Sequence, residues 1–437
     1  MSQSAEPIDG GTVDPDYPVT PVPSHARKTF FSLAVVLLGF TVFTPTMLAG
    51  AELGIAFSFG DLLLMIGLGS VILGTYVVLL GWIGARTGLT TVVMARYSLG
   101  TRGSKLASIL LGGTQIGWYG VIIGTVGELT GQAMGWESFA AKAAVMIASS
   151  VLMCLTACYG YRGMYWVSLV ATPLILVLAV WVVFRSLDEV GGWNAFLGSE
   201  PSTSMTAAVA ITTVVGTFVS AGTQAPNWTR FARSGSQAMW ACLIAFLLGN
   251  GLMILFGAIG AITFGEGDFV LVLYQLGLVG WGLFLLFGNL WKSNADTAYA
   301  FGVAGAELFE RPRKIPFIIG GSIIGTLLAL GGMHQHLVQY LVLLGIFIPP
   351  LGGVIIGDYL ARWRRSQMPP GAVLPRFDVM NLGVYAIASA LAWASDHWGS
   401  AIPPLVGIVT AILLTVLLRR GAGARDGGSL APGSRAT

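Results

Sequence analysis

Long apolar runs dominate this sequence and limit what it can fold into. Each run is about 20 residues long, enough to cross about 30 Å of hydrocarbon as an α-helix. We count twelve, near 30–54, 60–84, 106–133, 138–158, 164–184, 205–223, 236–264, 270–303, 315–331, 337–357, 379–394 and 401–418. The runs are continuous and contain glycines, unlike the alternating pattern of barrel strands. An all-α polytopic membrane protein with twelve transmembrane helices is therefore predicted.

The composition excludes a soluble domain and offers no enzymatic site. Only 10% of the 437 residues are charged, whereas soluble domains carry about a quarter. The three cysteines do not suggest a disulfide framework. His334 and His336 form a short pair, but two ligands do not complete a metal coordination shell. We predict no enzymatic activity, no catalytic residues, no metal and no cofactor.

The basic residues indicate how the chain is oriented. With the N-terminus inside, every Lys and Arg falls on the cytoplasmic side except Lys142 and Arg185, which fall outside, and Lys292, which lies within a span. This asymmetry predicts a multi-pass protein of the cell inner (plasma) membrane with both termini cytoplasmic. The net charge of +3 then reflects topology. The predicted partners are the lipid bilayer and a small molecule, with no nucleic acid and no obligate protein partner.

Two spans have sequences typical of broken helices. Residues 39–46 (GFTVFTPT) and 216–223 (GTFVSAGT) combine glycine with clustered Thr and Ser, and the first adds a proline. Five spans separate the two segments, as a five-plus-five inverted repeat requires. The alternative is that these hydroxyls bond to carbonyls of intact helices.

The resulting domain organisation has four parts. Residues 1–26 and 421–437 are predicted to be disordered cytoplasmic tails. The transport core would span 27–360, with a first repeat at about 27–186 and a second at about 203–360. Two additional transmembrane helices would occupy 361–420.

Four stretches resemble a known transporter family. They are 84–91 (GARTGLTT), 111–118 (LGGTQIGW), 218–223 (FVSAGT) and 349–356 (PPLGGVII). From Ser24 to about Arg365 the chain resembles the nucleobase:cation symporter-1 (purine-cytosine permease) family, and its bacterial cytosine permeases in particular. The resemblance implies a LeuT-like core with two extra helices and a secondary active transporter that imports cytosine by alternating access.

Other functions remain as alternatives. Relatives in this family carry hydroxymethylpyrimidine, hydantoins, allantoin or purines, so a related heterocycle is the alternative substrate. A channel is the alternative of a different class, and broken helices with a closed aromatic pocket speak against it.

A site selective for a planar heterocycle needs aromatic side chains that stack on its two faces and an amide that can both donate and accept hydrogen bonds. Gln115 and Trp118 are three residues apart and share a helical face. On periodicity alone Trp118 is a packing residue, and a glutamine inside a span is the sharper clue because it must be satisfied there.

The resemblance implies a role for each residue of the substrate site. Gln115 and Trp118 would bind the base, and Phe218 would provide the opposing ring. Ser220 and Asn294 would lie at the rim, and Thr217 replaces a serine of the closest relatives.

Span eight carries a polar stripe, Asn289, Lys292, Ser293 and Asp296, on one helical face. In sodium-coupled members of the family, helices one and eight hold the ion. The matching groups would be the carbonyls of Gly39, Val42 and Asn289 and hydroxyls at 292 and 293.

Lys292 departs from that pattern. An ammonium group donates hydrogen bonds where sodium needs an oxygen ligand. We therefore expect a proton, or no ion, to replace sodium. Whether Lys292 titrates stays open, because desolvation disfavours its charge whereas Asp296 favours it. The simpler alternative is that Lys292 and Asp296 only neutralise each other.

Overall fold

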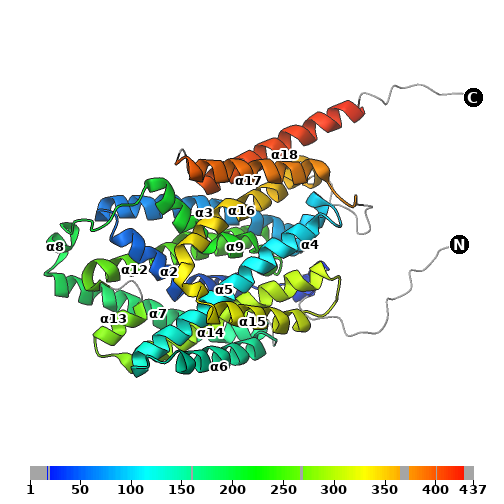
Figure 1. Ribbon diagram of the computed structural model, residues 1–437. Helices are drawn as coiled ribbons and strands as arrows, with labels where there is room; N and C mark the ends of the chain where they lie inside the picture. Colours follow the sequence, from blue (N-terminus) through cyan, green and yellow to red (C-terminus); the bar gives the residue numbers. More distant parts are fainter. Residues whose placement is uncertain are drawn as a thin grey trace, which may run out of the picture.

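The computed structural model describes residues 17, 20–158, 161–265, 269–364, 374–399 and 401–427. Every regular element of this part of the chain is helical (Figure 1). The α-helices are α1 Phe30–Thr41, α2 Thr44–Gly54, α3 Phe59–Thr87, α4 Thr91–Leu99, α5 Ser104–Met134, α6 Phe139–Cys158, α7 Tyr161–Val190, α8 Trp193–Leu197, α9 Ala207–Thr223, α10 Pro226–Thr229, α11 Gly235–Cys242, α12 Asn250–Phe264, α13 Phe269–Gln275, α14 Val279–Leu308, α15 Ile315–Leu330, α16 Leu337–Asp358, α17 Val379–His397 and α18 Pro403–Gly427. The all-α prediction is confirmed.

Each predicted apolar run coincides with one helix or with consecutive helices. Within the described residues, seven continuous helical stretches are long and apolar enough to cross a membrane, and the bent pair α1–α2 raises this number to eight. Helices α7, α14, α15 and α17 are not in this set, and of these α15 is an apolar helix of only 16 residues. The total of twelve spans stays a prediction.

The first span is broken where its sequence indicated. Helix α1 ends at Thr41, α2 begins at Thr44, and their axes differ by 53°. Phe43 between them is extended, with φ −139° and ψ 117°. Pro45 lies in the first turn of α2, where a missing N–H costs no helical hydrogen bond. The break thus frees backbone groups in the middle of the span.

The predicted break in the sixth span is wrong. Helix α9 runs without interruption through residues 216–223. Three of its threonine hydroxyls bond to carbonyls of the same helix: Thr212 to Ala208, Thr217 to Val214 and Thr223 to Val219. The clustered Thr and Ser residues therefore belong to an intact helix, and their hydroxyls do not mark a break in it. The chain leaves the helix only at Gln224, before α10.

Helix contacts come in pairs that relate the two halves of the core. The contact of α2 with α12 in one half corresponds to the contact of α9 with α3 in the other. In the same way, the contact of α1 with α7 corresponds to the contact of α9 with α16. Helix α14 likewise packs on α6 as α5 packs on α15, and α5 and α14 contact each other. These reciprocal contacts match an inverted repeat whose halves begin at α1 and α9. Helices α17 and α18 follow and pack against α16.

Small residues allow α2 and α12 to cross backbone to backbone. A Cβ added at Gly50 would lie 2.0 Å from the carbonyl oxygen of Ile254, and one at Gly257 would lie 2.0 Å from that of Met47. Such close approach is how helices associate in lipid, where no hydrophobic force drives them together. The second half of the broken span is thereby fixed to the other repeat.

The terminal segments differ from the predicted tails in their described parts. Val22 is buried and donates its N–H to the Gly88 carbonyl at 3.0 Å. The fully buried Arg230 donates to the Tyr17 carbonyl. Residues 1–16, 18–19 and 428–437 lie outside the described part of the chain. At the other end, α18 continues past 421 to Gly427.

Candidate functional site

A small cavity lies where the break between α1 and α2 meets α5, α9 and α14. Its lining has an apolar part and a polar part. The apolar part comprises four aromatic residues, Phe40, Phe43, Trp118 and Phe218, together with Ala221, and the polar part comprises Gln115, Thr217, Ser293 and Thr297. Sequence analysis predicted five of these nine residues as site residues: Gln115, Trp118, Thr217, Phe218 and, for the ion, Ser293.

The aromatic rings contact one another edge to face. Phe43 lies 5.5 Å from Trp118 and 5.9 Å from Phe218, measured between ring centroids, and Phe40 lies 5.6 Å from Phe218. Trp118 is backed by Tyr340 at 5.7 Å. Edge-to-face contacts hold each ring in a defined orientation. The cavity thus has rigid aromatic walls contributed by three separate helical segments.

Phe40 and Phe43 were missed by sequence analysis. Both belong to the segment 39–46 that predicted the break, yet only its glycine, hydroxyl and proline residues were used. Their side chains reach the cavity because α1 ends at Thr41 and the chain turns there. The signal was an aromatic residue on each side of a predicted helix break.

Gln115 is the main polar side chain of the cavity and is 1% exposed. Its Nε2 donates to the Ser220 Oγ at 3.0 Å, and Ser220 in turn shares a hydrogen bond with Thr114 at 2.5 Å. Ser220 therefore lies behind Gln115 and does not line the cavity. This anchor holds the amide in one orientation and leaves its oxygen and second N–H for other partners.

Thr217 and Asn294 are held in different ways. The Thr217 hydroxyl bonds to the Val214 carbonyl and to the amide of Asn250, which donates back at 3.0 Å. This leaves the threonine methyl for the cavity that Thr217 lines. Asn294 does not line the cavity, and its Nδ2 contacts the Met153 Sδ at 3.3 Å. The predicted position of Asn294 at the rim of the substrate stays a prediction.

Asn289 bridges the break in the first span. Its Oδ1 accepts from the Thr44 N–H at 3.0 Å, and its Nδ2 donates to the Val42 carbonyl. A single side-chain amide on α14 thus satisfies one donor and one acceptor that the break leaves without helical partners. Val42 and Asn289, both predicted ion-site residues, are brought together, but the Val42 carbonyl is engaged by an amide.

We expect Asn289→Ala to lower the thermal unfolding midpoint and to abolish uptake. The substitution leaves two buried backbone groups unpaired, at about 1–3 kcal/mol each. Asn289→Asp keeps the acceptor for Thr44 but places a buried carboxylate oxygen against the Val42 carbonyl, so its unfolding midpoint should fall at least as far as that of Asn289→Ala. Asn194→Ala, at an exposed position of α8, is the control and should melt as the wild type does. Wild-type melting of Asn289→Ala would contradict the bridging role.

Lys292 and Asp296 form a buried ion pair one helical turn apart. Lys292 Nζ lies 2.9 Å from Asp296 Oδ2, and the two side chains are 1% and 0% exposed. Among the residues that the structure describes, Nζ and both carboxylate oxygens are buried with no hydrogen-bond partner outside the pair. Nζ also lies 5.6 Å from the centroid of the Phe40 ring. The pair is compensated in charge but incompletely satisfied.

The pair lies beside the cavity and outside its lining. Ser293, next to Lys292, faces the cavity, and its buried Oγ has no partner within the described part of the chain. Gly39 is buried near the end of α1. Of the six predicted ion-site residues, Val42 is hydrogen-bonded to Asn289 and Lys292 is paired with Asp296. The ion site itself stays a prediction.

Comparison with a family model matches residues 21–369 to the permeases for cytosine/purines, uracil, thiamine and allantoin. A cytosine permease of Escherichia coli O157:H7 is 37% identical over 412 residues, which cover 93% of this chain and 96% of the relative. A hydantoin permease of Microbacterium maritypicum is 24% identical over 423 residues, covering 88% of this chain and 84% of the relative.

Solved structures show the same fold. Mhp1, a nucleobase-cation-symport-1 family transporter in a closed conformation with bromovinylhydantoin bound, aligns with a TM-score of 0.77 at 19% identity. The alignment covers 95% of this chain and 96% of that one. The inward-facing conformation of Mhp1 aligns with a TM-score of 0.79. A Na⁺-coupled sialic acid symporter aligns with a TM-score of 0.65 at 12% identity.

Proposed function

This chain belongs to the family of permeases for cytosine/purines, uracil, thiamine and allantoin, and from that premise we propose that it imports cytosine by alternating access. It is a multi-span membrane transporter of this family and not an enzyme. The observation that carries the choice of substrate is the cavity between Trp118 and Phe218 with the anchored amide of Gln115.

The chemistry of the cavity favours a neutral planar ring. Its described lining holds four aromatic residues and no charged side chain. An amino acid, a nucleotide or a carboxylate would enter without an opposite charge, at a large desolvation cost. A pyrimidine base has two faces for the aromatic walls, and its edge carries donors and acceptors that match an amide.

Cytosine is favoured over a hydantoin by the balance of similarity. The cytosine permease relative is 37% identical, whereas the hydantoin permease relative is 24% identical. A site that hydrogen-bonds a ring edge discriminates strongly against analogues that lack the matching group, because buried polar groups are then left unpaired. Hydroxymethylpyrimidine and allantoin remain the alternative substrates.

We expect saturable uptake of radiolabelled cytosine in membrane vesicles. Unlabelled cytosine should compete fully, and adenine, uracil and hydantoins should compete less well, because each presents a different ring size or edge to Gln115. Strong competition by hydroxymethylpyrimidine together with weak competition by cytosine would overturn the assignment. Flux that rises linearly with concentration would instead indicate a channel.

We further propose that sodium does not drive this transport and that a proton, or no ion, takes its place. Lys292 supports the proposal, since its Nζ lies among the residues matched to the sodium site and already compensates Asp296. A sodium ion bound beside the Lys292 ammonium would be repelled by it, because like charges interact strongly in a medium of low dielectric constant. The engaged carbonyl of Val42 adds to the argument.

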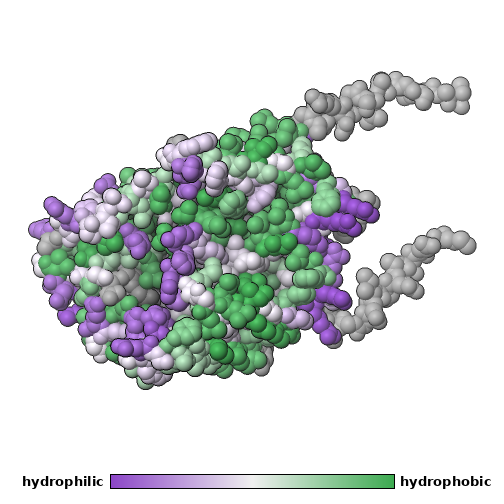
Figure 2. All heavy atoms as spheres, in the orientation of Figure 1, coloured by the Kyte–Doolittle hydropathy of each residue, from purple (hydrophilic) through white to green (hydrophobic). Residues whose placement is uncertain are grey.

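The proposed location is the cell inner membrane with both termini cytoplasmic. Ion pairs with basic residues gather at the predicted cytoplasmic end, where Asp358 accepts from Arg362 at 2.7 Å and from Arg419 at 3.0 Å. Figure 2 shows hydrophilic residues at the right-hand end, toward which α4 and α18 point in Figure 1. Lys142, predicted outside, pairs with Glu128 near the opposite end of α5.

A further inference from the structure

A second, apolar groove runs between α5, α14 and α15, and its lining shares no residue with that of the central cavity. Small and aromatic residues make up much of its walls, among them Gly112, Gly113, Gly320, Gly321, Phe309 and Phe317. Ile109 and Ile324, which also line it, are 57% and 51% exposed. Figure 2 shows apolar surface over the region of α15. In a bilayer, such an open apolar groove is filled by lipid chains.

Two glycines leave the floor of the groove open. A Cβ added at Gly113 or at Gly320 would meet no atom within 4 Å. The neighbouring Gly321 differs, since a Cβ there would lie 2.4 Å from the Phe301 ring. Gly321 is thus needed for helix packing, whereas Gly113 and Gly320 only keep space free. Larger residues at those two positions would fill the groove without a clash.

The loop 309–314 that joins α14 to α15 carries the charge at one end of the groove. Arg311 and Arg313 are exposed there, and Arg102 is exposed just before α5. Phe309 and Phe317, whose rings stack at 5.3 Å, line the groove on either side of this loop. Basic residues next to a hydrophobic groove complement a molecule with acyl chains and a negative headgroup.

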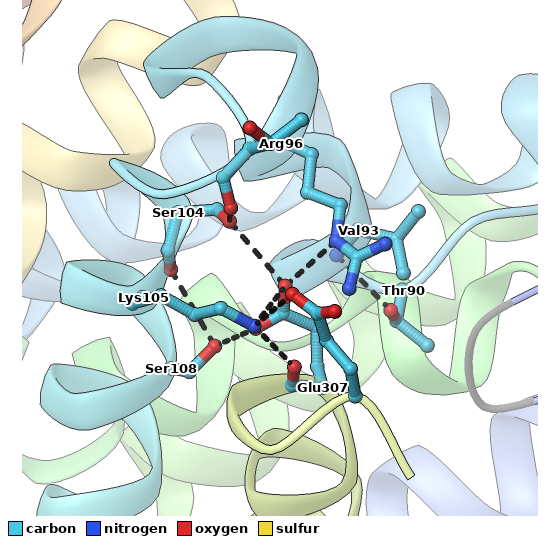
Figure 3. A network of polar contacts seen from close by, with 9 residues as sticks. Thr90, Val93, Arg96, Ser104, Lys105, Ser108 and Glu307 are labelled. Carbon is cyan, nitrogen blue, oxygen red and sulfur yellow. Dashed lines mark hydrogen bonds and ion pairs between the residues drawn. The ribbon is translucent and has the colours of Figure 1, made fainter. Parts of the chain in front are cut away.

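Acidic groups at this end are already neutralised. Lys105 Nζ lies 3.1 Å from Glu310, and its hydrogen bond and charge lower the pKa of Glu310. The buried Glu307 accepts from Arg96 at 2.7 Å, and from Ser104 and Ser108 (Figure 3). Lys105 also donates to the Glu307 carbonyl at 2.7 Å. Since the carboxylates have partners, Arg311 and Arg313 give this end a net positive charge.

We propose that this groove is a binding site for an anionic phospholipid of the cytoplasmic leaflet. The acyl chains lie along the glycine floor between α5 and α15, and the phosphate is bound at the end marked by Arg311 and Arg313. Ser108 lines the groove and also donates to Glu307, so bound lipid adjoins the polar network that joins α4, α5 and α14 (Figure 3). The leaflet follows from the proposed orientation, and the site itself is independent of the transported substrate.

Lipid retention by the purified full-length protein tests the proposal. Delipidated protein is titrated with phosphatidylglycerol or phosphatidylcholine, and bound lipid is measured by native mass spectrometry. Wild-type protein should retain phosphatidylglycerol at least about tenfold more tightly than phosphatidylcholine, because the two arginines favour the anionic headgroup. Inorganic phosphate in excess should not displace the lipid, since the chains contribute most of the binding.

Two kinds of variant separate the chain site from the headgroup site. Gly113→Leu and Gly320→Leu fill the groove and should weaken retention of both lipids. Arg311→Gln with Arg313→Gln should remove the preference for phosphatidylglycerol and leave the residual binding. Gly67→Leu is the matched control: it adds the same side chain to an exposed, open position of α3 and should change neither quantity.

The outcomes are distinct. Equal retention of the two lipids by wild-type protein, or wild-type retention in both glycine variants, would overturn the proposal. A change in oligomeric state in the glycine variants, with lipid retention unaltered, would assign the groove to a second copy of this chain. Thermal melting of each variant shows that it is folded, and Arg311→Gln with Arg313→Gln remains a test if a leucine variant does not fold. Loss of uptake with intact lipid retention would concern the transport assignment alone.

Discussion

Uptake of cytosine should fall to background in Gln115→Ala, together with the thermal stabilisation that cytosine gives the purified protein. Gln115 is the buried amide of the cavity and is anchored by Ser220. Alanine removes a donor and an acceptor, so that polar groups on the edge of the base lose their partners at about 1–3 kcal/mol each. Each such loss lowers affinity roughly 5-fold to 150-fold.

Gln115→Glu is expected to fail as well, for a different reason. A carboxylate keeps the size and the acceptors but cannot donate, and it adds a charge to a cavity whose described lining has none. The cost of an unpaired charge in such a site exceeds that of a neutral group. The two variants together separate the need for an amide from the need for a side chain of that length.

Gln132→Ala provides the control on the same helix. Gln132 is exposed near the end of α5, and its side-chain Nε2 donates to Glu128 Oε1 at 3.4 Å. Its replacement should leave uptake and the ligand-induced shift in melting temperature unchanged. If both Gln115 variants kept a wild-type shift with cytosine, Gln115 would not belong to the binding site.

Replacing sodium with choline at fixed pH should leave the rate of uptake unchanged. Lys292 occupies the region matched to the sodium site and lies 2.9 Å from Asp296, so the cation position is compensated without an ion. An inward proton gradient will stimulate uptake if Lys292 loses its proton during the cycle. If the ammonium is permanent, uptake will respond to neither gradient. A several-fold loss of uptake rate in choline would contradict both the proton-coupled and the uncoupled alternative.

Lys292→Thr is expected to create a response to sodium. The substitution removes the ammonium, supplies a hydroxyl beside Ser293, and leaves Asp296 buried without a counter-charge. An uncompensated buried charge costs about 3–5 kcal/mol, which sodium binding would relieve. Sodium should therefore raise the melting temperature of this variant, because a ligand that binds only the folded state stabilises it.

Two further variants identify the source of the sodium response. Lys292→Met removes the charge without adding an oxygen and should gain less stabilisation than Lys292→Thr. Combining Lys292→Thr with Asp296→Asn removes the carboxylate and should abolish the response. Wild-type protein stabilised by sodium as strongly as Lys292→Thr would refute the role given to Lys292.

The sequence by itself determined the fold class and the family. Apolar runs of membrane-spanning length are local features, because each backbone group of a span is satisfied within its own helix. The break in the first span was predictable for the same reason, since Pro45 and the glycine and hydroxyl residues of 39–46 act locally. The pair Gln115 and Trp118 was recognised because helical spacing places both on one face.

Only the tertiary structure decided which polar residues meet. The segments 39–46 and 216–223 look alike in sequence, yet α9 is intact, because its hydroxyls find carbonyls within the helix. Asn289 bonds across the break from a helix more than two hundred residues away. Asn294 turns toward Met153 while Ser293 reaches the cavity. Such choices depend on how helices distant in sequence pack together, and packing satisfies buried polar groups through partners that periodicity along one helix does not reveal.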